Sequence, residues 1–158
     1  MSLVATQFNR LPDGTRLDRA WIETHIPHQG HMCLLDEVLS WDTARIRCRA
    51  TSHRLSDNPL RAHGRLGAAC GVEYAAQAMA VHGAIMAYTA GTQARAGLLT
   101  SVRNLLLRVT RLDDLEADLV ASAERLAGDE ASTLYEFTLS CGGRELLSGR
   151  ASIVFGAE

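Results

Sequence analysis

A carboxylate, an amide and a group of histidines are the side chains of this sequence that could together move protons. Glu73 and Gln77 interrupt an otherwise apolar stretch, and because they are four residues apart they share one face of a helix. A carboxylate in apolar surroundings is costly unless it is hydrogen-bonded, paired or protonated. We therefore predict that Glu73 is a functional carboxyl group inside a cleft. The alternative is a glutamate that simply reaches water near a helix end.

The histidines that could act with this carboxyl lie on two segments that precede the apolar stretch. His28 and His31 follow Pro27 in an irregular segment, and His63 lies on the polar loop that leads into the apolar stretch. Histidine suits proton abstraction because its unperturbed pKa, about 6.5, is close to neutral pH. We expect one of these three histidines to lie beside the carboxyl, and we rank His28 first, His63 second and His31 third.

A metal site is the other interpretation of closely spaced histidines. His28 and His31 are three residues apart, but no third histidine, cysteine or carboxylate stands at a recognisable ligand spacing. The cysteines form no CxxC pair and are predicted to be small buried residues in a reducing compartment. They are Cys33, Cys48, Cys70 and Cys141. We predict neither a metal nor a cofactor.

The element that must position the carboxyl is the apolar stretch itself, residues 66–90. It is rich in alanine, methionine and glycine and is apolar on nearly every side, which predicts a helix buried on all faces. On such a helix His82 projects almost opposite to Glu73, so we interpret it as a packed or capping residue. The polar residues within the stretch argue against a membrane span.

The rest of the chain predicts an antiparallel sheet around this helix. Apolar and polar residues alternate in residues 43–52, where three arginines form the wet face, and again in residues 132–141. Gly142-Gly143 is a two-residue hairpin signal. A short helix is expected at residues 17–25, and this order of elements predicts an α+β fold. The strands are expected at residues 32–41, 43–52, 98–110, 115–125, 132–141 and 146–155.

Length and composition limit the function classes. The 158 residues suit a single domain, with residues 1–16 as a loosely ordered lead-in. A net charge of −2 and an aromatic content of 5% give no sign of a nucleic-acid or membrane partner. The first residues lack the sustained apolar segment of a signal peptide, so a cytoplasmic location is expected.

Three stretches together resemble the hotdog-fold beta-hydroxyacyl-(acyl carrier protein) dehydratases of fatty-acid biosynthesis. Residues 72–78, VEYAAQA, are similar to the family's E-MAQ helix signature. Pro27-His28 and the LLD and VL residues at 34–39 are similar to its opening segment, and residues 99–107 are similar to its third strand. The likeness spans residues 26–155 and looks closest to the divergent branch of aryl-polyene biosynthesis enzymes.

The resemblance implies a hotdog fold, in which an antiparallel sheet wraps one long buried helix. It also implies dehydration of 3-hydroxyacyl thioesters, carried on the 4'-phosphopantetheine of acyl carrier protein, to trans-2-enoyl thioesters. Glu73 matches the helix signature directly and would donate a proton to the leaving hydroxyl. In the family, a catalytic histidine lies on the loop before the helix. At the same distance before Glu73 this chain has Pro59, so we look for the residue that removes the C2 proton among His28 and His63.

The resemblance also suggests which residues would surround the substrate. Small residues at the start of the helix would let the backbone approach a ligand, and the amide one turn after Glu73 would hold the carboxyl in place. These expected substrate-site residues are His31, Gly67, Gly71 and Gln77. A homodimer or higher oligomer is expected because a single sheet of this kind leaves its edge strands unpaired.

Two other functions remain open at this stage. A hotdog thioesterase would use Glu73 to activate water against the thioester. A non-catalytic hotdog subunit would bind acyl chains or complete a heterodimer.

Overall fold

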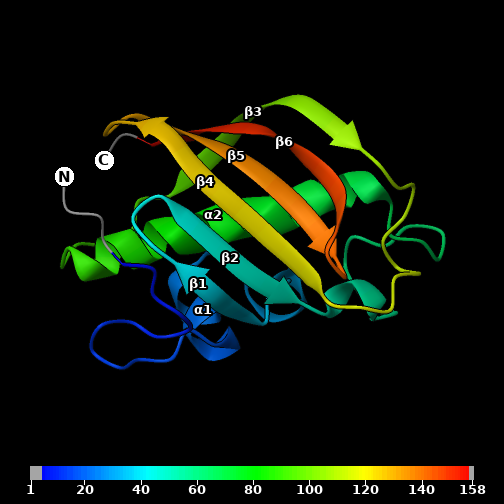
Figure 1. Ribbon diagram of the computed structural model, residues 1–158, viewed down its shortest axis with the longest axis horizontal. Helices are drawn as coiled ribbons and strands as arrows, with labels where there is room; N and C mark the ends of the chain where they lie inside the picture. Colours follow the sequence, from blue (N-terminus) through cyan, green and yellow to red (C-terminus); the bar gives the residue numbers. More distant parts are fainter. Residues whose placement is uncertain (1–4, 157–158) are drawn as a thin grey trace.

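The sheet and the helix predicted from the sequence form two layers in this computed structural model, which describes residues 5–156 (Figure 1). The six strands are ordered β1-β2-β4-β5-β6-β3, and every neighbouring pair is antiparallel. The elements are α1 (Arg19–His25), η1 (Gly30–Met32), β1 (Glu37–Trp41), β2 (Arg45–Ala50), η2 (Ser52–Arg54), η3 (Ala68–Cys70), α2 (Gly71–Thr89), β3 (Gly97–Leu107), β4 (Leu119–Gly128), β5 (Ser132–Cys141) and β6 (Arg144–Phe155).

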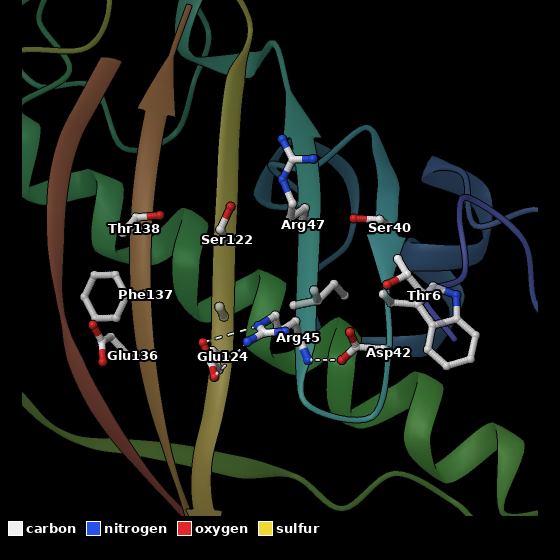
Figure 2. Close-up of a pocket in the computed structure, with 13 residues that line it drawn as sticks. Thr6, Ser40, Asp42, Arg45, Arg47, Ser122, Glu124, Glu136, Phe137 and Thr138 are labelled. Atoms are coloured by element: carbon white, nitrogen blue, oxygen red, sulfur yellow. Dashed lines mark hydrogen bonds and ion pairs between the residues drawn. The ribbon is translucent and has the colours of Figure 1, made fainter. Parts of the chain in front are cut away.

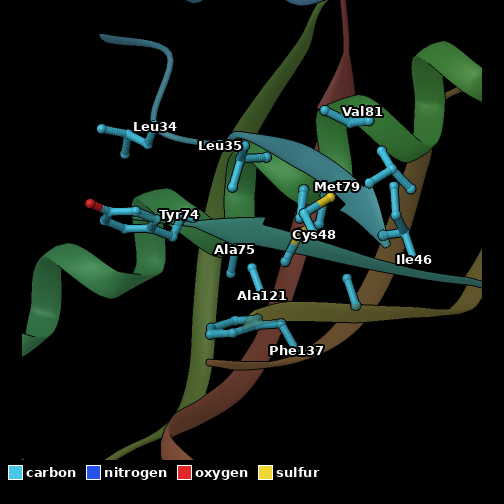
Figure 3. Close-up of a cluster of buried hydrophobic side chains, with 14 of the residues drawn as sticks. Leu34, Leu35, Ile46, Cys48, Tyr74, Ala75, Met79, Val81, Ala121 and Phe137 are labelled. Carbon is cyan, nitrogen blue, oxygen red and sulfur yellow. The ribbon is translucent and has the colours of Figure 1, made fainter. Parts of the chain in front are cut away.

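The core lies between α2 and the inner face of the sheet, which curves around the helix (Figure 1). Tyr74, Ala75 and Met79 of α2 are buried there with Ile46 of β2 and Phe137 of β5 (Figure 3). Burying a large apolar side chain contributes about 1.5–3 kcal/mol. This packing holds the first turn of α2, and therefore Glu73, at a fixed place relative to the sheet.

The alternating patterns read from the sequence are confirmed in β2 and β5. Every second residue of β5 is buried, from Thr133 to Cys141, and the intervening side chains are partly or fully exposed. The arginines of β2 lie on the outer face, where Arg45 pairs with Glu124. The hairpin at Gly142-Gly143 is also confirmed, because both glycines have positive φ values (59° and 78°), which the two-residue turn requires.

The long helix is shorter and less enclosed than the sequence predicts. It begins at Gly71, since residues 68–70 form a 3-10 turn, and it ends at Thr89. Val72, Ala76 and Ala80 are only partly buried, and Gly83 is exposed. Alanine and glycine are compatible with both buried and exposed positions, so the apolar composition did not reveal this open stripe.

The boundaries of β1 and β4 differ most from the prediction. The strand expected at residues 32–41 begins only at Glu37, because Gly30 has a positive φ of 60° and residues 30–32 form a 3-10 turn. The strand expected at residues 115–125 begins at Leu119 and continues to Gly128. Strand β4 extends to Gly128 because its pairing with β5 continues as far as Thr133.

The expected lead-in, as far as residues 5–16 show it, lies against the sheet. Gln7 exchanges two backbone hydrogen bonds with Trp41 of β1, at 2.7 and 2.8 Å. Leu11 is buried in the core cluster, and the predicted turn at residues 12–14 places Gly14 at a φ of 89°. Residues 1–4 lie outside the described part.

Strand β3 is an edge strand with an unusually apolar surface. It pairs with β6 on one side only. Its leucines are exposed, with Leu98 at 70% and Leu106 at 55% of their full accessibility. An exposed apolar edge strand favours pairing with another chain.

The interpretation of His82 as a packed residue is confirmed. Its ring is buried, Nε2 lies 2.9 Å from the carbonyl oxygen of Asp42, and Nδ1 lies 2.7 Å from the hydroxyl of Tyr135. Since a carbonyl can only accept, Nε2 carries the proton and the tyrosine hydroxyl donates to Nδ1. Burial lowers the pKa of His82, and burial likewise lowers the pKa of His53.

We predict that the stability of the fold decreases in mild acid. A buried histidine with a lowered pKa binds its proton more readily in the unfolded chain, whose pKa is about 6.5. Stability is therefore full above about pH 6.5 and is lost as the pH falls toward the folded-state pKa. Unfolding temperatures of the wild type and of His82→Gln, measured between about pH 7.5 and about pH 5, test this.

His82→Gln is expected to unfold at a lower temperature at neutral pH, because it loses a buried hydrogen-bond pair, but to depend less on pH. The control is His63→Asn, an exposed position that should keep the pH dependence of the wild type. An unchanged pH dependence in His82→Gln would contradict the prediction.

Candidate active site

Glu73 lies in the first turn of α2, two residues after the helix begins. Its side chain is 34% exposed, so the carboxyl lies at the margin of the core and not sealed within it. The free N–H groups of a helix N-terminus favour a negatively charged group at this position. The helix therefore holds a carboxylate where solvent or a ligand can reach it.

The segment between α1 and β1 places His28 beside this carboxyl. Helix α1 ends because Pro27 disfavours a helical conformation at Ile26, which has φ −119° and ψ 159°. The segment then turns at Gly30 and enters the core at Leu34, which is fully buried. We call residues 26–34 the opening loop.

The imidazole of His28 and the carboxyl of Glu73 are in direct contact. Nε2 lies 3.2 Å from Oε1 of Glu73, and the two side chains are 29% and 34% exposed. Nδ1 is buried and has no hydrogen-bond partner among the described residues. A neutral imidazole carries one proton, and the lack of an acceptor beside Nδ1 favours that proton on Nε2, directed at the carboxylate.

Gln77 joins the helix to the opening loop. Its side chain is fully buried, and Oε1 accepts a hydrogen bond from the backbone N–H of Leu34 at 2.9 Å. Nε2 donates to the carbonyl oxygen of Met32 at 2.7 Å and to Oε1 of Glu73 at 3.4 Å. Both amide hydrogens are thus used within the chain. These contacts describe a residue that positions the loop and the carboxyl, and leave Gln77 no free hydrogen for a substrate.

The other two candidate histidines lie elsewhere. Nδ1 of His31 is 3.2 Å from Oδ2 of Asp57, and both side chains are mostly exposed. His63 is at the tip of a two-residue turn with a φ of 53°, followed by Gly64, and is exposed. In the part of the chain that the structure describes, neither histidine forms a hydrogen bond or an ion pair with Glu73.

The two glycines expected at the substrate occupy different environments. Gly67 is exposed, and a Cβ built there would meet nothing within 4 Å. Gly71 is buried, and a Cβ there would lie 2.4 Å from Cδ2 of Leu147 and 2.8 Å from Cδ2 of Leu139. The absence of a side chain at Gly71 is thus explained by the close packing of α2 on β5 and β6, and not by access for a ligand.

The sequence analysis missed a group of buried polar side chains beside the pair. Ser52 and Asn58 come from the polar loop before α2, and Tyr74 follows Glu73 in the helix; all three are buried and hydrogen-bonded to one another. A tyrosine one residue after Glu73 points in a different direction on a helix, so spacing alone did not group it with the site.

Two hollows lie on the surface of the described residues, and neither is lined by His28 or Glu73. A groove of about 380 Å³ lies on the outer face of the sheet, where Arg45, Glu124 and Thr138 are among its lining residues (Figure 2). A smaller hollow, about 280 Å³, lies beside the opening loop and is lined by His31 and Asp57. Within the described residues, no three histidine, cysteine or acidic side chains gather as metal ligands would.

The architecture is that of the hotdog fold, as solved structures show. The chain is similar to the dehydratase heterocomplex ApeI:P from Xenorhabdus doucetiae, with a TM-score of 0.78 and 22% identity over 87% of this chain and 91% of that chain. It is also similar to thioesterase superfamily member 2 from zebra fish, with a TM-score of 0.59 and 14% identity over 87% of this chain and 95% of that chain. A mutant thioesterase from Pseudomonas aeruginosa gives a TM-score of 0.54 and 14% identity over 75% of this chain and 78% of that chain.

The sequence matches the ApeP-like family, described as ApeP dehydratase, over residues 20–157. The chain therefore belongs to the ApeP-like dehydratase family, which confirms the resemblance to the divergent aryl-polyene-type branch and supports a dehydratase role. No curated protein matches the sequence. No helix in residues 5–156 is long and apolar enough to cross a membrane.

We predict opposite effects for two glycine substitutions in α2. Gly71→Ala should lower the free energy of unfolding by about 1–3 kcal/mol, because its Cβ collides with the two leucines of the sheet. Gly83→Ala is the matched control: it is exposed in the same helix with open space around it, and should raise the free energy of unfolding by about 0.5–1 kcal/mol. Denaturant titration of both variants tests the assignment. A neutral or stabilising Gly71→Ala would show that the close packing is absent.

Proposed function

We propose that this protein dehydrates 3-hydroxyacyl thioesters carried on acyl carrier protein and releases trans-2-enoyl thioesters. The observation that carries the proposal is the 3.2 Å contact between His28 and Glu73 at the start of α2. Membership of the ApeP-like dehydratase family supports the reaction class. The whole chain is proposed to act as one hotdog domain, without metal or cofactor.

The proposed reaction needs one proton removed and one proton delivered. Because neutral His28 carries its proton on Nε2, Nδ1 takes the proton from C2 once the bound acyl chain reaches it, and the adjacent carboxylate stabilises the imidazolium that forms. Proton transfer across the 3.2 Å contact makes Glu73 the acid that protonates the C3 hydroxyl. The C2–H and C3–O bonds break, the C2–C3 double bond forms, and water leaves. Over a full turnover the pair neither gains nor loses a proton.

A thioesterase is the second candidate, and the thioesterases among the structural neighbours are the observation that favours it. In that reaction Glu73 would activate water for attack on the thioester carbonyl. The products differ, since hydrolysis frees a thiol and dehydration does not.

We predict that the purified protein converts a 3-hydroxyacyl thioester on acyl carrier protein to the enoyl product without releasing free thiol. Glu73→Gln and His28→Asn should keep the fold and lose about two to four orders of magnitude in turnover, because each removes a proton-transfer group. His31→Asn and His63→Asn are the matched controls and should stay near the wild-type rate. Enoyl product and free thiol are measured separately in each reaction.

Each result of that assay has a distinct meaning. Release of thiol without enoyl product would favour the thioesterase. Neither product, with a correctly folded protein, would favour a non-catalytic subunit that binds acyl chains or completes a heterodimer. Near-normal turnover by Glu73→Gln would make Glu73 a structural residue.

We also propose that β3 mediates assembly into a homodimer at least. Its unpaired edge carries exposed leucines, and pairing two such edges would cover them. A related hotdog subunit is the alternative occupant, since one structural neighbour is a dehydratase heterocomplex. The four free cysteines support a reducing compartment such as the cytoplasm.

Light scattering at micromolar concentration should therefore give at least twice the mass of the 17.1 kDa chain. Leu106→Lys should shift the protein toward the monomer, because it places a charge on the edge of β3 that the proposed dimer would bury. Leu126→Lys changes an exposed leucine of β4 and should leave the mass unchanged. A monomeric wild type would contradict homodimerisation.

A further inference from the structure

The opening loop is held by a buried polar network that the proposed reaction does not itself use. Leu34 is fully buried, so its backbone N–H and C=O cannot be left to water. The N–H is taken by Gln77, as described above, and the C=O accepts a hydrogen bond from Oγ of Ser52 at 2.8 Å. Both backbone polar groups of Leu34 are therefore bound by side chains distant in sequence.

The hydroxyl of Tyr74 is the centre of this network. It lies 2.8 Å from Oγ of Ser52 and 3.1 Å from Nδ2 of Asn58. Ring and hydroxyl are fully buried, and Tyr74 and Leu34 lie at the same end of the core cluster (Figure 3). Burial raises the pKa of Tyr74, which keeps the hydroxyl protonated and able to donate.

The donors and acceptors of the network can be assigned without ambiguity. Ser52 has one hydroxyl proton, and that proton goes to the carbonyl oxygen of Leu34, because a carbonyl can only accept. Ser52 must therefore accept from Tyr74. Tyr74 in turn accepts from the amide of Asn58, whose oxygen is occupied by the N–H of Leu60 at 2.9 Å. Every bond in the series has one direction.

The series links the polar loop before α2 to the catalytic carboxyl. It runs from Asn58 through Tyr74 and Ser52 to the C=O of Leu34, and then from the N–H of the same residue through Gln77 to Glu73. Its middle is the loop that carries His28. Loss of one bond in a buried series leaves its neighbours unsatisfied, so the members act together.

We propose that Tyr74 is a positioning residue for His28: its hydroxyl, acting through Ser52, fixes the opening loop at Leu34 and so sets the distance between His28 and Glu73. The consequence for turnover rests on the proposed function. The consequence for the loop does not, because it concerns only how often the loop detaches from the core.

Tyr74→Phe removes the hydroxyl and keeps the ring, and Tyr135→Phe is the matched control. Tyr135 is also a buried tyrosine with one bonded hydroxyl, but its partner is His82 of α2, which bonds in turn to the carbonyl oxygen of Asp42 and to no residue of the opening loop. Both variants should lower the unfolding temperature. Only Tyr74→Phe should increase backbone hydrogen exchange in residues 26–36, by about tenfold, the equivalent of one net hydrogen bond.

Exchange is compared with kinetics in the same variants. Tyr74→Phe should lower kcat about tenfold with KM nearly unchanged, because the substrate still binds while the pair is misaligned. Tyr135→Phe should keep the wild-type kcat. Exchange in residues 26–36 that is unchanged in Tyr74→Phe, or equally raised in both variants, would overturn the proposal.

The experiment separates this proposal from the proposed function. If the wild type has no dehydratase activity, the exchange comparison still decides whether Tyr74 holds the loop. If Tyr74→Phe does not fold, Ser52→Ala replaces it, since it removes the direct bond to Leu34 while leaving the aromatic core intact. The same local increase in exchange is expected from Ser52→Ala, and its absence would overturn the proposal.

Discussion

The site depends on one constraint: the opening loop enters the core without a strand to satisfy its backbone. A buried N–H or C=O without a partner costs about 1–3 kcal/mol. The chain meets this constraint with side chains, because Gln77 bonds to the backbone of Met32 and Leu34. Since Gln77 stands one turn after Glu73, the bonds that satisfy the loop also bring His28 to the carboxyl.

The pair is partly exposed because it stands at the edge of the core. The opening loop is anchored at its two ends by buried side chains, those of Ile26, Cys33 and Leu34, and its backbone at Leu34 is held by the hydrogen bonds of Gln77 and Ser52. His28 lies between these anchored ends. The carboxyl is placed by α2, and the imidazole is placed by the loop that these contacts fix.

The layers of the fold could be predicted from the sequence, because period-two alternation and paired glycines act locally. Residues 132–141 and Gly142-Gly143 show this, and the expected strand and turn are both present. Glu73 could also be singled out, since a carboxylate in an alanine-rich helix conflicts with its surroundings. These signals need no knowledge of distant contacts.

The choice among the histidines could not be made from the sequence with the same certainty. His28, His31 and His63 all lie on irregular segments, whose course is set by tertiary hydrogen bonds and positive φ values. For the same reason the strand expected from residue 32 begins only at Glu37. The open stripe of α2 was hidden by alanine and glycine, which suit either environment.

The central claim is that His28 and Glu73 act as one unit in dehydration, and a double-mutant cycle tests it most directly. Turnover of 3-hydroxyacyl thioester is measured for the wild type, His28→Asn, Glu73→Gln and the double variant. Residues that work together are strongly non-additive, so the double variant should be no slower than the slower single variant. If the two losses multiply instead, the groups act independently, and the account of a shared proton is contradicted.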